Sequence, residues 1–151
     1  MDLTIKLDGE NYLNIRVALI VQTKNGFVLQ KHKRGFYFFL GGRLKTGESS
    51  LQAAKREMME ETGLEIENFK LVSVLENFFS GEENTKTQEI CFVYTTPIIE
   101  KIDWDIELVE INKEDIVEVG RQEMIEMDIL PEIIKKLILE SKLEAISHFI
   151  V

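Results

Sequence analysis

Three glutamates are spaced so that a helix would bring them together. Glu57, Glu60 and Glu61 stand at positions i, i+3 and i+4, which project from one side of a helix. Like charges at this spacing repel one another and destabilise an isolated helix. A hard divalent cation would offset the repulsion, because Mg²⁺ takes oxygen ligands in near-octahedral geometry. The spacing therefore suggests a Mg²⁺ site, and a solvated acidic helix face is the alternative that it leaves open.

Residues just upstream of these acids could support such a site. Arg56 can pair through two hydrogen bonds with a carboxylate, and Glu48 is the candidate partner. The pair Gly41-Gly42 permits a tight backbone turn, whose carbonyl and amide groups can approach a metal ion or a phosphate.

The segment 49–62 has the periodicity of a helix that can hold the acids in place. Its core-facing stripe consists of Leu51, Ala54, Met58 and Thr62. Ser49 or Ser50 can cap the start, and Gly63 stands where a C-terminal glycine belongs. At 100° per residue the glutamates centre roughly 110° from the stripe, beside the buried face rather than opposite it. Packing could thus fix carboxylates that still reach a cleft.

The rest of the chain predicts an α+β domain with a mixed sheet between helices. Lys24-Asn25-Gly26 is a hairpin signal, and Pro131 suits the first turn of a helix. No linker, repeat or low-complexity stretch divides the chain, so we expect one domain over 1–151. The expected strands are 14–21, 27–32, 71–79, 89–96, 106–111 and 145–151, with an aromatic run at 36–40 and helices at 122–127 and 131–141.

The segment from Gly42 to Leu64 resembles the signature of a known family. It matches the Nudix hydrolase box, G-x5-E-x7-R-E-U-x-E-E-x-G-U with U a bulky apolar residue, at every specified position. The preceding Phe39-Leu40-Gly41-Gly42 is similar to the L-P-G-G entry of that family, with Leu40 where proline is common. The matching residues are Gly42, Glu48, Arg56, Glu57, Met58, Glu60, Glu61, Gly63 and Leu64.

The resemblance implies a Nudix-type α/β/α sandwich that hydrolyses a pyrophosphate bond in a nucleoside diphosphate linked to another moiety. It implies Mg²⁺, with Mn²⁺ as a substitute, held by Glu57, Glu60, Glu61 and the Gly41 carbonyl. A metal-activated water would attack phosphorus. Glu57 is the first choice for the base, and Glu60 and Arg56 complete the implied catalytic set. A non-catalytic nucleotide-sensing Nudix-like domain is the alternative, although such domains often lack box acids that are intact here.

Substrate contacts are harder to place from the sequence. Gly42 and Glu48 belong to the box, and Arg34 in the turn before it could meet phosphates or be solvated. Phe78 could stack on a nucleobase, although aromatic residues in strands are commonly core. Candidate substrates are nucleoside triphosphates, nucleotide sugars such as ADP-ribose, dinucleoside polyphosphates and capped RNA ends.

Charge and composition exclude some functions. In 151 residues, 27 Asp and Glu outweigh 18 Lys and Arg, giving a net charge of -9. Such a surface repels nucleic-acid backbones, so we expect a small nucleotide substrate rather than long nucleic acid. No membrane-spanning run or signal peptide is apparent, and the single Cys91 fits a reducing compartment. These features predict a cytoplasmic protein without a membrane partner, and the resemblance adds that homodimers are frequent.

Overall fold

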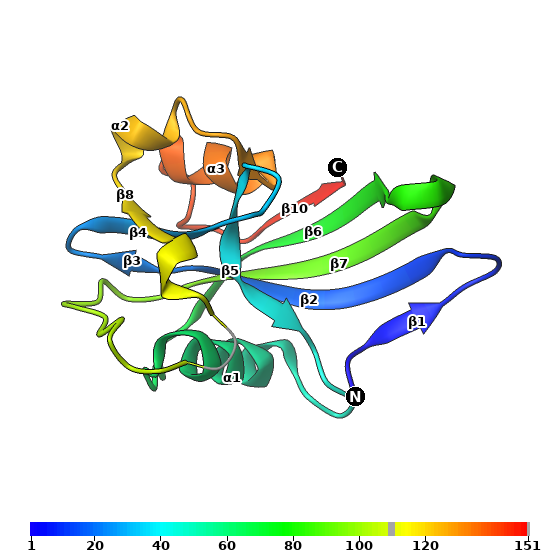
Figure 1. Cartoon of the computed structure of the whole chain (residues 1–151), viewed down its shortest axis with the longest axis horizontal. Helices are drawn as coiled ribbons and strands as arrows, with labels where there is room; N and C mark the ends of the chain where they lie inside the picture. Colours follow the sequence, from blue (N-terminus) through cyan, green and yellow to red (C-terminus); the bar gives the residue numbers. More distant parts are fainter. Residues whose placement is uncertain (109–110, 151) are drawn as a thin grey trace.

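The computed structural model describes residues 1–108 and 111–150 (Figure 1). No helix within these ranges has the length and apolar character needed to cross a membrane. The strands are β1 Thr4–Lys6, β2 Tyr12–Ile20, β3 Gln22–Thr23, β4 Gly26–Lys31, β5 Tyr37–Arg43, β6 Lys70–Ser80, β7 Lys86–Thr95, β8 Ile116–Val119, β9 Ile129–Leu130 and β10 Ser147–Ile150. The helices are α1 Ser50–Thr62, α2 Arg121–Met124 and α3 Glu132–Leu139, with 3-10 turns η1 Glu82–Asn84 and η2 Lys113–Asp115.

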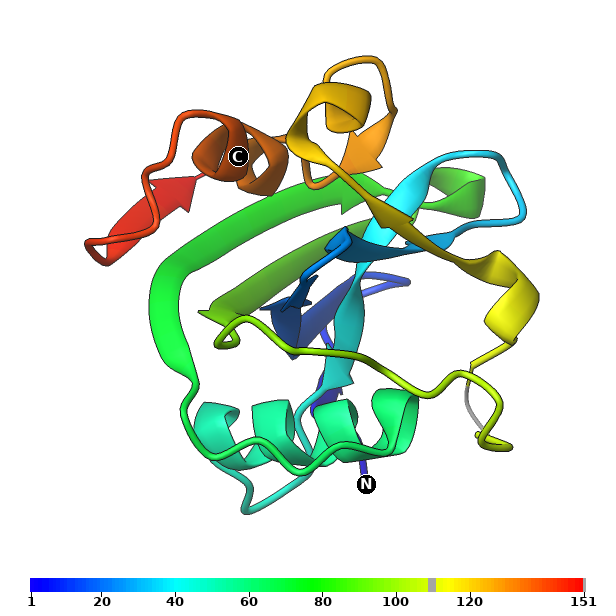
Figure 2. The same cartoon turned by 90° about the vertical axis from the view of Figure 1, so that its left-hand side faces the viewer.

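The strands form one mixed sheet in the order β10-β6-β7-β2-β5-β4-β3, with β1, β8 and β9 pairing onto β2, β4 and β5. The pairs β2–β7, β5–β9 and β6–β10 are parallel and the others antiparallel. α1 covers one face of this curved sheet, and α2 with α3 covers the other (Figures 1 and 2). The predicted α+β architecture, a mixed sheet between helices, is confirmed.

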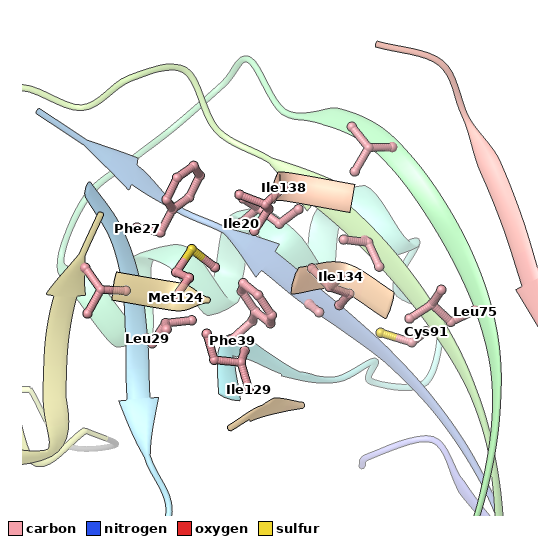
Figure 3. Close-up of a cluster of buried hydrophobic side chains, with 14 residues drawn as sticks. Ile20, Phe27, Leu29, Phe39, Leu75, Cys91, Met124, Ile129, Ile134 and Ile138 are labelled. Carbon is pink, nitrogen blue, oxygen red and sulfur yellow. The ribbon is translucent and has the colours of Figure 1, made fainter. Parts of the chain in front are cut away.

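The sheet is buried on both faces, which explains the unbroken apolar run of β2. Val17 and Leu19 point into the core under α1, whereas Ala18 and Ile20 point into the core under α2 and α3. The second core packs Phe39 and Leu75 of the sheet against residues of α2 and α3 (Figure 3).

The predicted helix at 49–62 forms as α1, and its ends follow the predicted chemistry. Ser49 is the N-cap: its hydroxyl accepts from the Gln52 amide, and the Gln52 side chain accepts from the Ser49 amide. Gly63 ends the helix in the left-handed conformation, at φ 73°. One detail of the prediction is wrong, because Leu51 is 40% exposed rather than part of the buried stripe.

The least accurate predictions fall between β7 and α3. The strand predicted at 106–111 is not present in its described part, where Ile106 is exposed; residues 109 and 110 lie outside the described residues. β8 instead pairs with β4, since Val119 meets Phe27 there. The helix expected at 122–127 is the shorter α2, and β5 continues through its two glycines. The closing strand is β10, and residue 151 of its predicted range lies outside the described residues.

Candidate active site

The glycines at the end of β5 are the platform on which α1 places its acids. Gly42 lies opposite Val17 of β2, and a Cβ at Gly42 would be 2.3 Å from Oε1 of Glu57. That separation is shorter than any real Cβ contact, so the Glu57 carboxylate occupies the space that a side chain at residue 42 would take. Only glycine permits this close approach.

A second buried carboxylate reaches the neighbouring glycine. The Gly41 amide donates to Oε2 of Glu61 over 2.9 Å. Gly41 has a φ of 140°, and a Cβ there would be 2.1 Å from the carbonyl oxygen of Val17. Glu57 and Glu61 are only 5% and 6% exposed. Burying two carboxylates is costly unless charged or hydrogen-bonding groups compensate them.

Arg56 compensates one of these two carboxylates, Glu57, and also pairs with Glu48 and Glu60. Its Nε and Nη2 donate to the two oxygens of Glu48 over 2.7 and 3.0 Å, which is the bidentate pair predicted from the sequence. Its Nη1 donates to Glu57 over 2.6 Å and to Glu60 over 3.0 Å. Nη2 also donates to the carbonyl of Arg43 over 3.0 Å, which links the helix to the end of β5.

This network fixes the protonation state of the pair at its centre. The hydrogen bonds from Arg56 hold the pKa of Glu48 below its usual range, against the opposing effect of burial. The backbone amide of Lys45 donates to Glu48 over 2.8 Å and acts in the same direction. The same contacts raise the pKa of Arg56. Both oxygens of Glu48 thus accept hydrogen bonds and hold Arg56 in place. The predicted contact of Glu48 with substrate stays a prediction.

The donor set fits a hard divalent cation by its chemistry. Glu57, Glu60 and Glu61 present carboxylate oxygens from one side of α1, and Glu60 is the most exposed. Nζ of Lys45 also lies 3.7 Å from Oε1 of Glu60.

The acids are not drawn together around a metal-sized space in this structure. Within residues 1–108 and 111–150 no three acidic, His or Cys side chains are close enough to hold an ion as they stand. Glu57 and Glu60 both turn toward Arg56. Loading a metal would therefore require these carboxylates to rotate away from the guanidinium.

Arg34 is not brought to the acids. It lies in the turn between β4 and β5, where its amide donates to Nδ1 of His32 over 3.1 Å. This turn leads into the first residue of β5 and lies beside α2 and α3, at the opposite end of the strand from Gly42 and remote from α1 (Figure 1). The strand from Tyr37 to Gly42 spans roughly 16 Å at about 3.3 Å per residue. Arg34 is therefore left outside the proposed site.

Phe78 also lies away from the acids. It pairs with Gln88 on β7, whereas the residue of β7 nearest Gly41 across β2 is Val93. The distance along β7 is again roughly 16 Å. Phe78 is 51% exposed and borders a groove of about 330 Å³ at the far end of the sheet. That groove is lined by Leu7, Asp8, Asn11, Tyr12, Phe78, Phe79, Ser80, Lys86, Thr87 and Gln88.

A polar group on the sheet face opposite α1 was not predicted from the sequence. Asn14 and Arg16 of β2 face the same way as Ala18, and Asn14 is 8% exposed. The Asn14 Oδ1 and Arg16 Nε atoms are buried without a hydrogen-bond partner. Nη1 of Arg16 lies 3.9 Å from the carboxylate of Glu89. The signal was available as polar residues at alternate positions of an otherwise apolar strand.

Comparison with known proteins places this geometry in context. A family model described as the NUDIX domain matches residues 12–139. The NAD-capped RNA hydrolase NudC of Haemophilus influenzae is 31% identical over 116 residues, which cover 60% of this chain and 44% of that protein. The oxidized purine nucleoside triphosphate hydrolase of Danio rerio is 35% identical over 72 residues, covering 45% of this chain and 46% of that protein. The chain thus matches less than half the length of each.

Solved structures show the same fold. A MutT protein from Bacillus halodurans superposes with a TM-score of 0.66 at 23% identity, covering 91% of this chain and 90% of that one. A MutT protein from Methanosarcina mazei Go1 gives a TM-score of 0.60 at 19% identity, covering 90% of this chain and 95% of that one. At these identities the likeness establishes the fold, and it confirms the predicted α/β/α sandwich.

Proposed function

This chain belongs to the Nudix hydrolase family, and on that premise we propose that it hydrolyses a pyrophosphate bond in a nucleoside diphosphate linked to another moiety. The single observation that carries the proposal is the seating of Glu57 on Gly42, with Arg56 bridging Glu57, Glu60 and Glu48. The alternative left open by the sequence is a solvated acidic face. The carboxylates of such a face would stay in water, whereas Glu57 and Glu61 are buried against the glycine pair.

We assign the metal ligands to Glu57, Glu60 and Glu61, with the Gly41 carbonyl as a fourth oxygen. When bound, Mg²⁺ (or Mn²⁺ in its place) supplies charge neutralisation for the diphosphate and lowers the pKa of a coordinated water. Gly41 positions the Glu61 carboxylate through a hydrogen bond from its amide. Gly42 positions the Glu57 carboxylate by leaving room for it where a side chain would otherwise be.

The remaining roles follow from the contacts around Arg56. Its guanidinium holds Glu57 and Glu60 on one side and is itself held by Glu48 on the other, so Arg56 is a positioning residue. Glu57 is our first choice to accept the proton of the attacking water.

We propose a small nucleotide as the substrate. A chain with a net charge of -9 disfavours a long polyanion, whose many phosphates would each meet repulsion. The names of the relatives point to two chemistries, NAD-capped RNA and oxidized purine nucleoside triphosphates. Both contain a pyrophosphate linkage next to a nucleoside, which is the group that we assign to this site.

The test is hydrolysis of a nucleotide panel with Mg²⁺ and with a chelator in its place. The panel contains nucleoside triphosphates, ADP-ribose, a dinucleoside polyphosphate and a capped RNA oligonucleotide, with products separated by chromatography. We expect Mg²⁺-dependent release of a nucleoside monophosphate from at least one of the small nucleotides.

The test variants and their controls all replace glutamate by glutamine within residues 57–67. The triple variant Glu57→Gln, Glu60→Gln, Glu61→Gln should be inactive, whereas Glu65→Gln and Glu67→Gln change exposed acids just beyond α1 and should not affect turnover. Nucleotide binding without turnover by the wild-type protein would instead identify a nucleotide-sensing domain and refute the proposed hydrolysis.

A further inference from the structure

Two arginines lie directly opposite each other on the sheet face away from α1. Arg16 of β2 is the register partner of Arg43 of β5. Residues directly opposite in an antiparallel pair point to the same face, and their Cβ atoms are about 4.5–5.5 Å apart. Ala18, two residues along β2, packs in the core under α2 and α3, which identifies that face. Like charges in this arrangement are destabilising.

The contacts recorded for these arginines leave much of their charge and hydrogen-bonding capacity unused. The Nε of Arg16 is buried without a partner, and its ion pair with Glu89 is long, at 3.9 Å. The side chain of Arg43 is exposed and forms no ion pair within residues 1–108 and 111–150, and the carbonyl of Arg43 accepts from Nη2 of Arg56. Two residues before Arg16, the Oδ1 of Asn14 is buried and also lacks a partner.

The arginine pair sits beside the proposed reaction centre. Arg43 follows Gly42 directly, and Gly42 carries the Glu57 carboxylate. Arg16 borders a small cavity together with Glu89, Phe38 and the Leu130-Pro131 bend that precedes α3. Two positive charges of an acidic protein thus lie next to Gly42, on the face of the sheet opposite the acidic cluster.

We propose that Arg16 and Arg43 together bind one phosphate oxyanion of the substrate on this face. A guanidinium matches a phosphate through two parallel hydrogen bonds, and an anion shared between the two would remove their repulsion. The acids under α1 would act on one phosphorus while the arginine pair holds a neighbouring phosphate. The inference rests on the proposed function, because it assigns part of the substrate of that same site.

The direct test is calorimetric titration without metal, in a buffer that contains a chelator. Inorganic pyrophosphate and AMP are the two probes, since the bound phosphate could belong to the leaving group or to the nucleotide. The variant Arg16→Gln, Arg43→Gln is compared with the charge-retaining Arg16→Lys, Arg43→Lys. A matched control, Lys6→Gln, Lys136→Gln, removes two exposed positive charges elsewhere.

We expect the glutamine variant to bind at least one probe about tenfold more weakly or worse, as expected for lost charge-assisted hydrogen bonds. The lysine variant should lose less, and the control should change less than about twofold. The probe that is affected identifies the source of the phosphate, and either identification supports the proposal. Equal affinity of wild type and glutamine variant for both probes would overturn it.

Stability gives a readout that a merely structural role would not produce. Arg43→Gln alone should raise the melting temperature at low salt by about 1–3 °C, because it removes the cross-strand repulsion. The same exposed substitution should weaken phosphate binding. A fall in melting temperature, with unchanged binding, would contradict the proposal even if the double variant failed to fold.

Kinetics separate this inference from the proposed function. If the wild-type protein turns over a nucleotide, the glutamine variant should show a KM about tenfold higher with kcat changed less than about threefold. An unchanged KM in an active enzyme overturns the arginine site alone. Absence of turnover by the wild-type protein refutes the proposed hydrolysis, whereas the titration still decides whether the arginine pair binds phosphate.

Discussion

The two faces of the sheet beside the Gly41-Gly42 pair differ in how their polar groups are satisfied. Under α1, Arg56 gives hydrogen bonds to three carboxylates and one carbonyl, and Gly41 binds another acid. On the opposite face, Arg16 and Asn14 each bury an atom without a partner. The first region is held together by its own residues, whereas the second leaves hydrogen bonds for a ligand to complete. The difference suggests that one face supplies the chemistry and the other recognition.

The largest effect should follow from removing one acid of the first region. Glu61→Gln keeps the size of the side chain and an acceptor for the Gly41 amide, but removes the charge that a hard cation needs. We expect hydrolysis to fall by roughly 10²-fold or more, because the metal supplies both the nucleophile and charge neutralisation. The melting temperature without metal should be unchanged or slightly higher, since repulsion with Glu57 is relieved. Near wild-type turnover would remove Glu61 from the ligand set.

Metal binding should also be visible as stability. An ion that binds the native state and not the unfolded state stabilises by ~2.7 kcal/mol at a hundredfold its dissociation constant. The melting temperature should therefore rise with Mg²⁺, as the carboxylates turn from Arg56 toward the ion. Salt screening would mimic this in an acidic protein, so Na⁺ at matched ionic strength is the control. An undiminished Mg²⁺ response in the triple glutamine variant of Glu57, Glu60 and Glu61 would show that the ion binds elsewhere.

A methyl group added at Gly42, on the α1 face, tests whether the glycine is needed to hold the Glu57 carboxylate. In Gly42→Ala the new Cβ would be 2.3 Å from Oε1 and 2.6 Å from Cδ of Glu57, so the carboxylate must shift. We expect turnover to fall about tenfold or more, because displacing a catalytic group by about 1 Å can have that effect. Gly120→Ala is the matched control, since its Cβ would meet only Oε1 of Glu123 at an ordinary 3.6 Å. Equal activity of the two variants would argue against the platform.

The contrast between the faces also explains what the sequence could predict. The acids, Arg56 and Gly42 stand close together in the chain, so helical geometry and local chemistry sufficed to place them; the Arg56–Glu48 pair was predicted and is confirmed. The arginine pair depends instead on the register of β2 against β5. This register brings together residues 16 and 43, which are separated in the chain by β3 and β4. No local pattern sets that register.

The same reasoning accounts for the differences between sequence and structure. The aromatic character of Phe78 and the position of Arg34 just before the box suggested substrate contacts, whereas strand length separates each of them from the acids by roughly 16 Å. The strand at 106–111 was predicted from local hydrophobicity, but the edge of β4 is taken by β8, whose Val119 and Val117 match its register. Pairing partners distant in sequence decided each case.

A smaller effect is expected from weakening the Arg56 network without removing its charge. Arg56→Lys cannot form the bidentate bond to Glu48 while also contacting Glu57 and Glu60. We expect a loss of stability of about 1–3 kcal/mol at neutral pH and a several-fold loss of activity. Urea unfolding measures the first and steady-state kinetics the second.

The pH dependence of that loss has a definite sign. Hydrogen bonds from Arg56 lower the pKa of Glu48 in the folded state, so the pair stabilises the fold above the ordinary value near 4.5. This contribution is lost as the pH falls through the lowered folded pKa. The stability difference between wild type and Arg56→Lys should therefore shrink in strong acid. Glu48→Gln should reduce the pH dependence of the difference, because Glu57 and Glu60 remain as partners of Arg56. A difference that is constant with pH in the wild-type background would assign the loss to packing.

The smallest effect concerns Cys91, which lies on the sheet face opposite α1, beside Arg16 and Glu89. Burial raises the pKa of its thiol to about 12. Because the thiolate is the reactive form, a thiol reagent near pH 8 should label the native protein only slowly, at a rate that follows unfolding. Above the ordinary pKa of 9.0 the unfolded chain loses its thiol proton first, so stability should decline with rising pH, and Cys91→Ala should flatten that decline. Rapid labelling of the folded protein would mean that the cavity opens to solvent beneath Arg16. The unpartnered atoms of that face would then be hydrated, and the contrast between the two faces would be weaker than the structure indicates.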